Sequence, residues 1–141
     1  MKYVVDASVG LKWVLPELHS DKALRLRDDF EAAIHELLSP DIFSIEVANT
    51  LARAERNAVI APGEADLLLA VVNSSNPQLH PHHPLLRRAL AIATAARHGD
   101  YDCVYVALAE RERCELVTAD DRMIKRLGPT FPFILPLASF P

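Results

Sequence analysis

Two short apolar runs that each lead into an acidic residue place the strongest constraint on how this chain can fold. Residues 2–6 read Lys-Tyr-Val-Val-Asp, and residues 115–120 read Glu-Leu-Val-Thr-Ala-Asp. Runs of this kind predict short buried strands. Stretches with apolar residues at helical spacing separate them, and strands separated by helices pair in parallel through right-handed crossovers. We therefore predict an α/β fold, a three-layer α/β/α sandwich with a central, mostly parallel sheet.

Breaks in the apolar pattern predict the remaining elements. We expect further strands at residues 37–39, 78–80 and 131–135. We expect helices at residues 7–15, 20–37, 41–56, 62–72, 84–98, 101–113 and 121–127. Gly99 is expected to take the left-handed position that ends one helix, and Asp100 to cap the start of the next.

Length and composition limit the class of protein. The chain has 141 residues, of which 50% are hydrophobic, so we expect residues 1–141 to form a single domain with a sizeable core. No uninterrupted apolar run approaches the ~18 residues of a membrane span, which favours a soluble, cytoplasmic protein with no membrane partner. Cys103 and Cys114 fall on one predicted helix roughly 16 Å apart, too far to bridge, as expected in a reducing compartment.

The net charge does not identify a partner by itself. Lys and Arg number 15 against 19 Asp and Glu, giving a net charge of −4, whereas non-specific nucleic-acid binding depends on clustered positive charge. If several acids surround a metal ion, however, the arginines remain available at the rim of the site. Nucleic acid therefore stays open as a substrate.

Four acidic residues occupy positions where the predicted fold would bring them together. In parallel sheets, sites form beyond the carboxyl ends of the strands, and both Asp6 and Asp120 follow predicted strands. Asp102 lies in the first turn of its helix, and Glu46 lies one turn into another helix. Mutual repulsion would raise the pKa values of these carboxyl groups unless a hard divalent cation neutralised them. The pattern predicts a divalent metal site.

Taken singly, these residues have ordinary structural explanations. Asp102 and Asp120 are also suitable helix caps, and Glu46 would most often be a solvated helix residue. Asp6 is harder to explain in this way, because an acid that ends a buried strand is costly to desolvate without a partner. Tyr101 is interpreted first as a packing residue, with stacking on a nucleic-acid base as the alternative. His80, His82 and His83, interleaved with prolines, are interpreted as an exposed loop.

Four motifs taken together resemble a known family. They are Val4-Val5-Asp6-Ala7-Ser8, Ser44-Ile45-Glu46-Val47-Ala48-Asn49, the run from Tyr101 to Glu110, and Val117-Thr118-Ala119-Asp120. Their order, spacing and the chain length are similar to those of PIN-domain nucleases, and most of all to the VapC toxins of toxin–antitoxin pairs. The resemblance implies a divalent-metal-dependent ribonuclease with RNA as substrate, a cognate antitoxin and a homodimer.

The resemblance also implies roles for individual residues. Asp6, Asp102 and Asp120 would bind Mg²⁺, or Mn²⁺, directly or through water, and Glu46 would hold an outer water or act as base toward the attacking one. Three further residues would support these groups or the substrate. Ser8 and Thr118 would hydrogen-bond a carboxylate or a phosphate oxygen, Asn49 would orient Glu46, and Arg53 would meet RNA phosphates.

Other functional classes remain as alternatives. A metal-dependent phosphatase would require a second Asp two residues after Asp6, where Ser8 stands. A receiver-type phosphoacceptor would require an adjacent acidic pair and a Lys after a late strand, a pattern that we do not find. A PIN-like nucleic-acid-binding or scaffolding module without catalysis would be expected to carry an incomplete acidic quartet, and this quartet is complete.

Overall fold

A five-stranded sheet forms the middle layer of the molecule. The structure, a computed structural model, describes residues 1–99 and 101–141. The strands are β1 (Lys2–Val5), β2 (Glu36–Pro40), β3 (Gln78–His80), β4 (Glu115–Thr118) and β5 (Ile134–Pro136). They lie in the order β3-β2-β1-β4-β5, and every neighbouring pair is parallel. The predicted parallel sheet is confirmed, and β1 and β4 lie next to each other at its centre.

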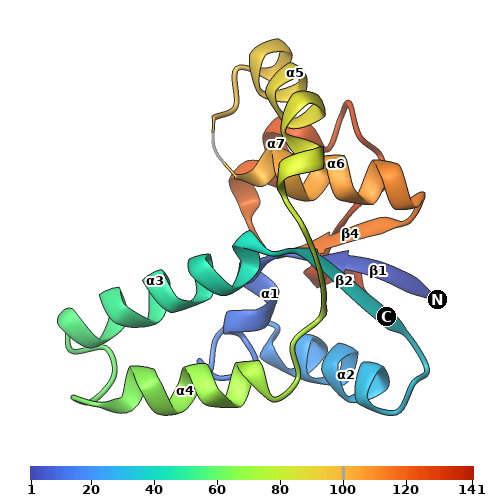
Figure 1. The fold of residues 1–141 in the computed structure, drawn as a ribbon. Helices are drawn as coiled ribbons and strands as arrows, with labels where there is room; N and C mark the ends of the chain where they lie inside the picture. Colours follow the sequence, from blue (N-terminus) through green and yellow to red (C-terminus); the bar gives the residue numbers. More distant parts are fainter. Residues whose placement is uncertain (100) are drawn as a thin grey trace.

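Helices cover both faces of this sheet, which confirms the predicted three-layer sandwich. On one side lie α1 (Ala7–Leu11), α2 (Ser20–Glu31), α3 (Ile42–Arg56) and α4 (Glu64–Asn73), and on the other α5 (Leu86–Ala96), α6 (Asp102–Glu112) and α7 (Asp121–Leu127) (Figure 1). The described residues also form two short 3₁₀ helices, η1 (His83–Leu85) and η2 (Leu137–Ser139). Within residues 1–99 and 101–141, no helix combines the length and apolarity that a membrane crossing requires.

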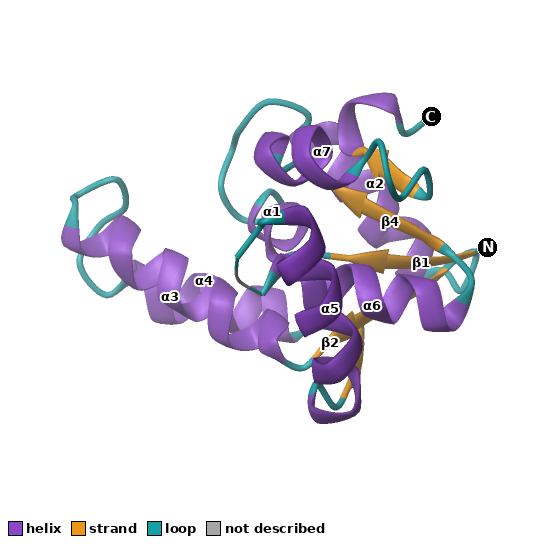
Figure 2. Cartoon of the chain, turned by 90° about the horizontal axis from the view of Figure 1, so that it is seen from above, coloured by secondary structure: helices purple, strands orange, loops and turns teal. Residues whose placement is uncertain are grey.

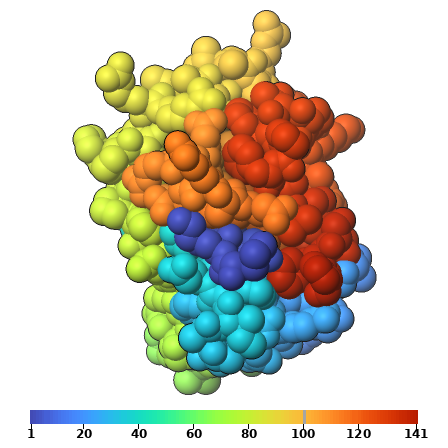
Figure 3. Space-filling model, turned by 90° about the vertical axis from the view of Figure 1, so that its right-hand side faces the viewer, coloured from blue at the N-terminus to red at the C-terminus, as the bar shows by residue number. Residues whose placement is uncertain are grey.

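Alternation along the strands divides the core into two. Val4 packs on the side of α5, α6 and α7, whereas its neighbours Tyr3 and Val5 pack on the side of α1, α2 and α3. Successive side chains of a strand point to opposite faces of its sheet, so one strand serves both cores. In Figure 3 the start of β1 (dark blue) reaches the surface between the orange and cyan segments. The carboxyl end of β1 points away from the side of the molecule that Figure 3 shows.

The α3–α4 pair extends beyond the sheet as a long helical hairpin (Figures 1 and 2). At its base α1 packs very closely against α3. A Cβ atom added to Gly10 would lie 2.6 Å from Cζ of Phe43, closer than real contacts allow. Glycine at this position therefore lets α1 approach α3, and this packing fixes α3 beside the carboxyl end of β1.

Several predicted boundaries are wrong. Helix α2 ends at Glu31 rather than at residue 37, because Ala33 adopts a left-handed conformation with φ of 59° and Leu37 pairs with Tyr3 in the sheet. The last strand covers Ile134–Pro136 rather than residues 131–135. Its predicted first residue, Phe131, instead donates its N–H to the carbonyl of Leu127 in a turn, and the proline that follows has no N–H to donate.

Two predictions concern the connection between α5 and α6. Arg97, with φ of 52°, takes the left-handed position that ends α5, so the prediction of this role for Gly99 is wrong. The predicted cap at Asp100 lies outside the described residues. In the histidine-rich segment before α5, His82 and His83 are exposed as predicted, whereas His80 ends β3 and is only partly exposed, so the prediction of an exposed loop is wrong for His80. His82 Nδ1 lies 2.7 Å from Oδ1 of Asp41.

Candidate functional site

Asp6 is a buried carboxylate at the carboxyl end of the central strand β1. It forms the N-cap of α1, accepts the N–H of Val9 at 3.4 Å, and is only 4% exposed. Burial raises its pKa from 3.8 to about 7; hydrogen bonds from Ser8 and Thr118 oppose this rise, and the negative charges of Asp102 and Asp120 add to it. The ionised form is thus unfavourable here without a compensating positive charge.

Two hydroxyl groups fix Asp6 between the central strands. Ser8 Oγ donates to one carboxylate oxygen of Asp6 and Thr118 Oγ1 donates to the other, each at 2.5 Å. Ser8 Oγ in turn accepts the N–H of Ala119 at 2.9 Å, and Thr118 Oγ1 accepts that of Asp120 at 3.0 Å. Because backbone amides occupy the acceptor side of both hydroxyls, their protons point to Asp6. Ser8 and Thr118 therefore contact a carboxylate, as one of the two predicted options for them.

Asp120 lies beside Asp6 because β4 is the direct neighbour of β1. Val5 pairs with Val117, so both strands end at the same level of the sheet. Asp120 caps α7, and its Oδ1 accepts the N–H groups of Arg122 at 2.9 Å and Met123 at 3.3 Å. Its capping function and its place beside Asp6 therefore coexist.

Asp102 begins α6 and is held by a buried histidine. Its Oδ2 lies 2.6 Å from Nε2 of His98, whose side chain is 3% exposed. The other ring nitrogen, Nδ1, has no hydrogen-bond partner among the described residues. With a proton on Nε2, the imidazole donates to Asp102 and leaves Nδ1 as the acceptor. The sequence reasoning did not include His98, although it stands four residues before Asp102.

Glu46 reaches the site from α3 and accepts a hydrogen bond from a tyrosine of α6. The Tyr105 hydroxyl donates to Oε1 of Glu46 at 2.6 Å, and this tyrosine is 1% exposed. Burial, followed by the charge of Glu46, raises the pKa of Tyr105, so its hydroxyl remains a donor. The sequence reasoning did not assign Tyr105 to the site, but its position three residues after Asp102 puts both on one side of α6.

One hollow of about 170 Å³ gathers the four acids. It is lined by Asp6, Ala7, Ser8, Leu11, Glu46, Thr50, Asp102, Tyr105 and Asp120. A second hollow of about 230 Å³ is lined by Glu46, Asn49, Thr50, Arg53, Tyr101 and Asp102. Asn49 and Arg53 thus lie along α3 in the second hollow. Tyr101 is 55% exposed, so its interpretation as a packing residue is wrong.

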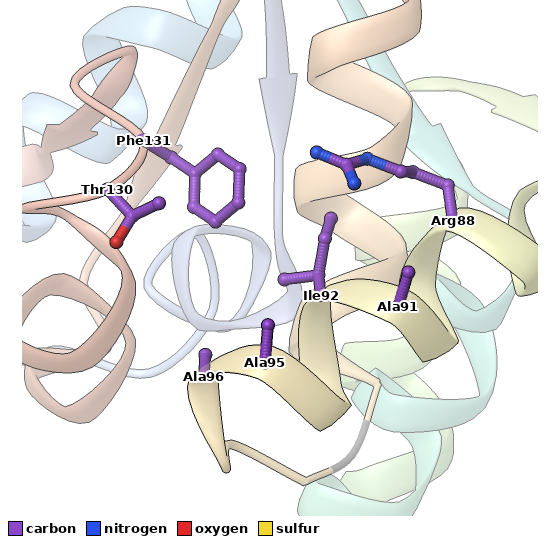
Figure 4. A pocket seen from close by; sticks show the side chains of 7 residues that line it. All are labelled: Arg88, Ala91, Ile92, Ala95, Ala96, Thr130 and Phe131. Carbon is purple, nitrogen blue, oxygen red and sulfur yellow. The ribbon is translucent and has the colours of Figure 1, made fainter.

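A further hollow elsewhere lacks the chemistry of this one. It measures about 250 Å³ and lies between α5 and residues 130–131, where Ile92, Phe131 and several alanines line it (Figure 4). Its one charged residue, Arg88, donates to both carboxylate oxygens of Glu110. Without a carboxylate or other group able to move a proton in its lining, it is a weaker candidate than the smaller acidic hollow.

Comparison with known proteins agrees with the geometry. Residues 3–128 match the PIN domain family. Ribonuclease VapC3 from Pyrobaculum aerophilum is 33% identical over 139 residues, covering 96% of this chain and 98% of that protein. The crystal structure of PAE2754 from the same organism superimposes with a TM-score of 0.70 at 23% identity, covering 99% of this chain and 94% of that one. The chain belongs to the PIN domain family.

Proposed function

We propose that residues 1–141 form one PIN-like nuclease domain that hydrolyses RNA phosphodiester bonds with the help of a divalent metal ion. The observation that carries this proposal is the hollow in which Asp6, Glu46, Asp102 and Asp120 meet, although they come from four separate parts of the chain. RNA as the substrate is supported by the similarity to a protein named Ribonuclease VapC3. The activity is that of an endoribonuclease.

The donors in this hollow suit a hard cation. They are carboxylate oxygens, and burial raises the pKa of Asp6 to about 7, a shift that a cation bound beside it would oppose. Among the described residues, no group of three or more His, Cys, Asp or Glu side chains is placed to hold a metal ion. Mg²⁺, however, retains several waters and binds through one or two carboxylates together with substrate phosphate. Asp6, Asp102 and Asp120 would hold it, and Mn²⁺ suits the same oxygens.

The side chains around the hollow have different roles in the proposed hydrolysis. A bound divalent ion supplies charge neutralisation at the phosphate and lowers the pKa of water. Glu46 accepts a proton from the attacking water, while the Tyr105 hydroxyl holds its carboxylate in place and Asn49 lies further along the same helix. No covalent intermediate with the protein is needed.

Three groups keep the metal-binding carboxylates oriented. Ser8 and Thr118 donate to the two oxygens of Asp6, and His98 contacts Asp102. Ligands held in this way need little rearrangement when an ion and a phosphate enter. Arg53, on the rim, meets a phosphate of the bound strand.

We further propose that the protein is the toxin of a toxin–antitoxin pair and acts in the cytoplasm as a homodimer. The four motifs that resemble VapC toxins support the pairing with a cognate antitoxin. Exposed apolar side chains on the α3–α4 hairpin, Ile45, Leu67 and Val71, support a protein partner or a second copy on this part of the surface.

Cleavage of RNA by the purified chain tests the proposed activity. Structured and unpaired RNAs are incubated with Mg²⁺, with Mn²⁺ and with EDTA, and the products are separated by size. We expect cleavage only with a metal ion, and a loss of at least about 100-fold in Asp6→Asn. The control is Asp21→Asn, which removes a carboxylate from an exposed position of α2 and should cleave normally.

Two outcomes would contradict the proposal. Cleavage that persists in EDTA or in Asp6→Asn would rule out the metal-dependent mechanism. RNA binding without cleavage would favour the catalytically silent binding or scaffolding module, and phosphate release from a monoester without RNA cleavage would favour a phosphatase.

A further inference from the structure

The acidic hollow continues into a neighbouring hollow of different chemistry. The two share Glu46, Thr50 and Asp102 as a common wall. Beyond this wall the second hollow, of about 230 Å³, adds Arg53 and Tyr101 to its lining. A strand whose phosphate lies beside Asp6 is therefore next to a region with a cationic and an aromatic side chain.

The added side chains match the parts of one nucleotide. Arg53 is exposed in the last turn of α3, and its guanidinium suits a phosphate group. Tyr101 is 55% exposed immediately before α6, so much of its aromatic ring is accessible to a ligand. Aromatic rings in such grooves serve as platforms on which bases stack, and each base has a flat face that can use them.

Another cationic hollow, on α7, lacks this combination. Arg122, Lys125 and Arg126 of α7 line a hollow with no aromatic side chain. Such a surface can attract phosphates of any nucleic acid, but it offers nothing for a base. The second hollow differs because it can contact both parts of a nucleotide.

We propose that Asn49, Thr50, Arg53 and Tyr101 form a subsite for one unpaired nucleotide of RNA, adjacent to the phosphate that is cleaved. Tyr101 stacks on the base, and Arg53 contacts a phosphate of the same strand. The base must be unpaired and unstacked, because in a duplex both of its faces are covered by neighbouring bases. This subsite rests on the proposed ribonuclease function, and it makes the enzyme selective for loops and single strands.

Binding measurements on uncleaved RNA test the subsite. All proteins carry Asp6→Asn so that the RNA stays intact, and fluorescence anisotropy in Mg²⁺ gives the dissociation constant for a labelled single-stranded RNA and for the same sequence in a duplex. We expect Tyr101→Ala to weaken single-strand binding roughly tenfold, in the range for loss of one stacked base, with less than about twofold effect on the duplex. Tyr101→Phe, which retains the ring, should recover most of the loss.

Arg53→Ala and a matched control distinguish a specific contact between Arg53 and a phosphate from the general effect of positive charge on RNA binding. Arg56, also exposed in the last turn of α3, does not line the hollow. We expect Arg53→Ala to reduce the slope of log K against log salt for single-stranded RNA by about 0.7, the value for one phosphate contact. Arg56→Ala should leave single-strand affinity within about twofold of the parent.

The results also distinguish failure of the subsite from failure of the proposed function. An unchanged dissociation constant in Tyr101→Ala, or an equal loss on single-stranded and duplex RNA, would overturn the subsite even if the wild-type chain cleaves RNA. Equal effects of Arg53→Ala and Arg56→Ala would do the same for the phosphate contact. A wild-type chain that cleaves no RNA, while Tyr101→Ala still loses single-strand affinity selectively, would refute the nuclease and retain the subsite.

Discussion

Asp6→Asn is expected to stabilise the metal-free protein above pH 7, although it removes the proposed activity. The pKa of Asp6 is raised from 3.8 to about 7, first of all by burial. An acid whose pKa is higher in the folded state binds its proton more tightly there than in the unfolded chain. Its contribution to stability is therefore fully present below pH 3.8, falls as the pH rises toward 7, and stays at its minimum above that value.

The size of this effect follows from the interval between the two pKa values. From 3.8 to about 7, at about 1.4 kcal/mol per pKa unit, ionised Asp6 lowers the free energy of unfolding by at most about 4 kcal/mol. An asparagine avoids this penalty but accepts only one of the hydrogen bonds that Ser8 and Thr118 donate to Asp6. The hydroxyl left without its acceptor costs about 1–3 kcal/mol. The net gain for Asp6→Asn at pH 8.5 is thus about 1–3 kcal/mol.

Urea unfolding of wild type and Asp6→Asn in EDTA, from pH 4 to pH 9, measures this difference. The difference in unfolding free energy should grow as the pH rises to 7 and then level off. Asp21→Asn, at an exposed position, should stay within about 0.5 kcal/mol of wild type throughout. If Asp6→Asn proves no more stable than wild type at pH 8.5, the inferred free-energy cost of burying the ionised Asp6 carboxylate is wrong.

Addition of Mg²⁺ gives an independent readout of the same site. An ion that binds only the folded state stabilises it by about 2.7 kcal/mol at a concentration 100 times its dissociation constant. Wild type at pH 8.5 should gain stability on this scale as Mg²⁺ increases, whereas Asp6→Asn should gain much less. Equal gains in the two proteins would show that the ion binds elsewhere.

Two further substitutions test the packing and the hydrogen bonds that position the site. Gly10→Ala should lower the free energy of unfolding by about 1–3 kcal/mol, because the new Cβ would lie 2.6 Å from Cζ of Phe43. Gly99→Ala, whose new Cβ would meet no atom of the described surroundings within 4 Å, is the control in urea unfolding. Tyr105→Phe should lower kcat by about 10-fold or more, because Glu46 loses the hydroxyl that holds it, and this loss should disappear in a protein that already carries Glu46→Gln. An equal loss in both backgrounds would show that Tyr105 acts independently of Glu46.

The sequence predicted the sheet and the meeting of the acids because both depend on local pattern. Asp6 and Asp120 directly follow buried strands, and parallel pairing necessarily brings the ends of neighbouring strands to one edge. The locations of Asp102 and Glu46 were predicted from their positions near the start of helices that begin at this edge. The same reasoning predicted the end of α2 wrongly, because Leu37 fits a helical stripe as well as a strand and only its pairing with Tyr3 decides between them.

The partners of the acids could not be predicted in the same way. The bond from Tyr105 to Glu46 joins α6 to α3, and these residues are 59 positions apart in the chain. His98 is close to Asp102 in sequence, but whether it points inward depends on how the chain turns between α5 and α6. A side chain's spacing from a known acid marks it as a candidate, and only the packing of the layers identifies it as a contact.

The topology that brings the acids together also provides their first stabilisation. In a parallel α/β sheet the carboxyl ends of strands and the amino ends of the following helices lie at the same edge. Asp6 and Asp120 use this directly, since both accept backbone N–H groups at the start of a helix. Glu46 lies inside α3, where backbone N–H groups are already engaged, and it accepts a tyrosine hydroxyl instead. The quartet thus combines two acids that accept backbone N–H groups at the start of a helix, Asp6 and Asp120, with two that side chains from outside the quartet contact, Asp102 beside His98 and Glu46 beside Tyr105.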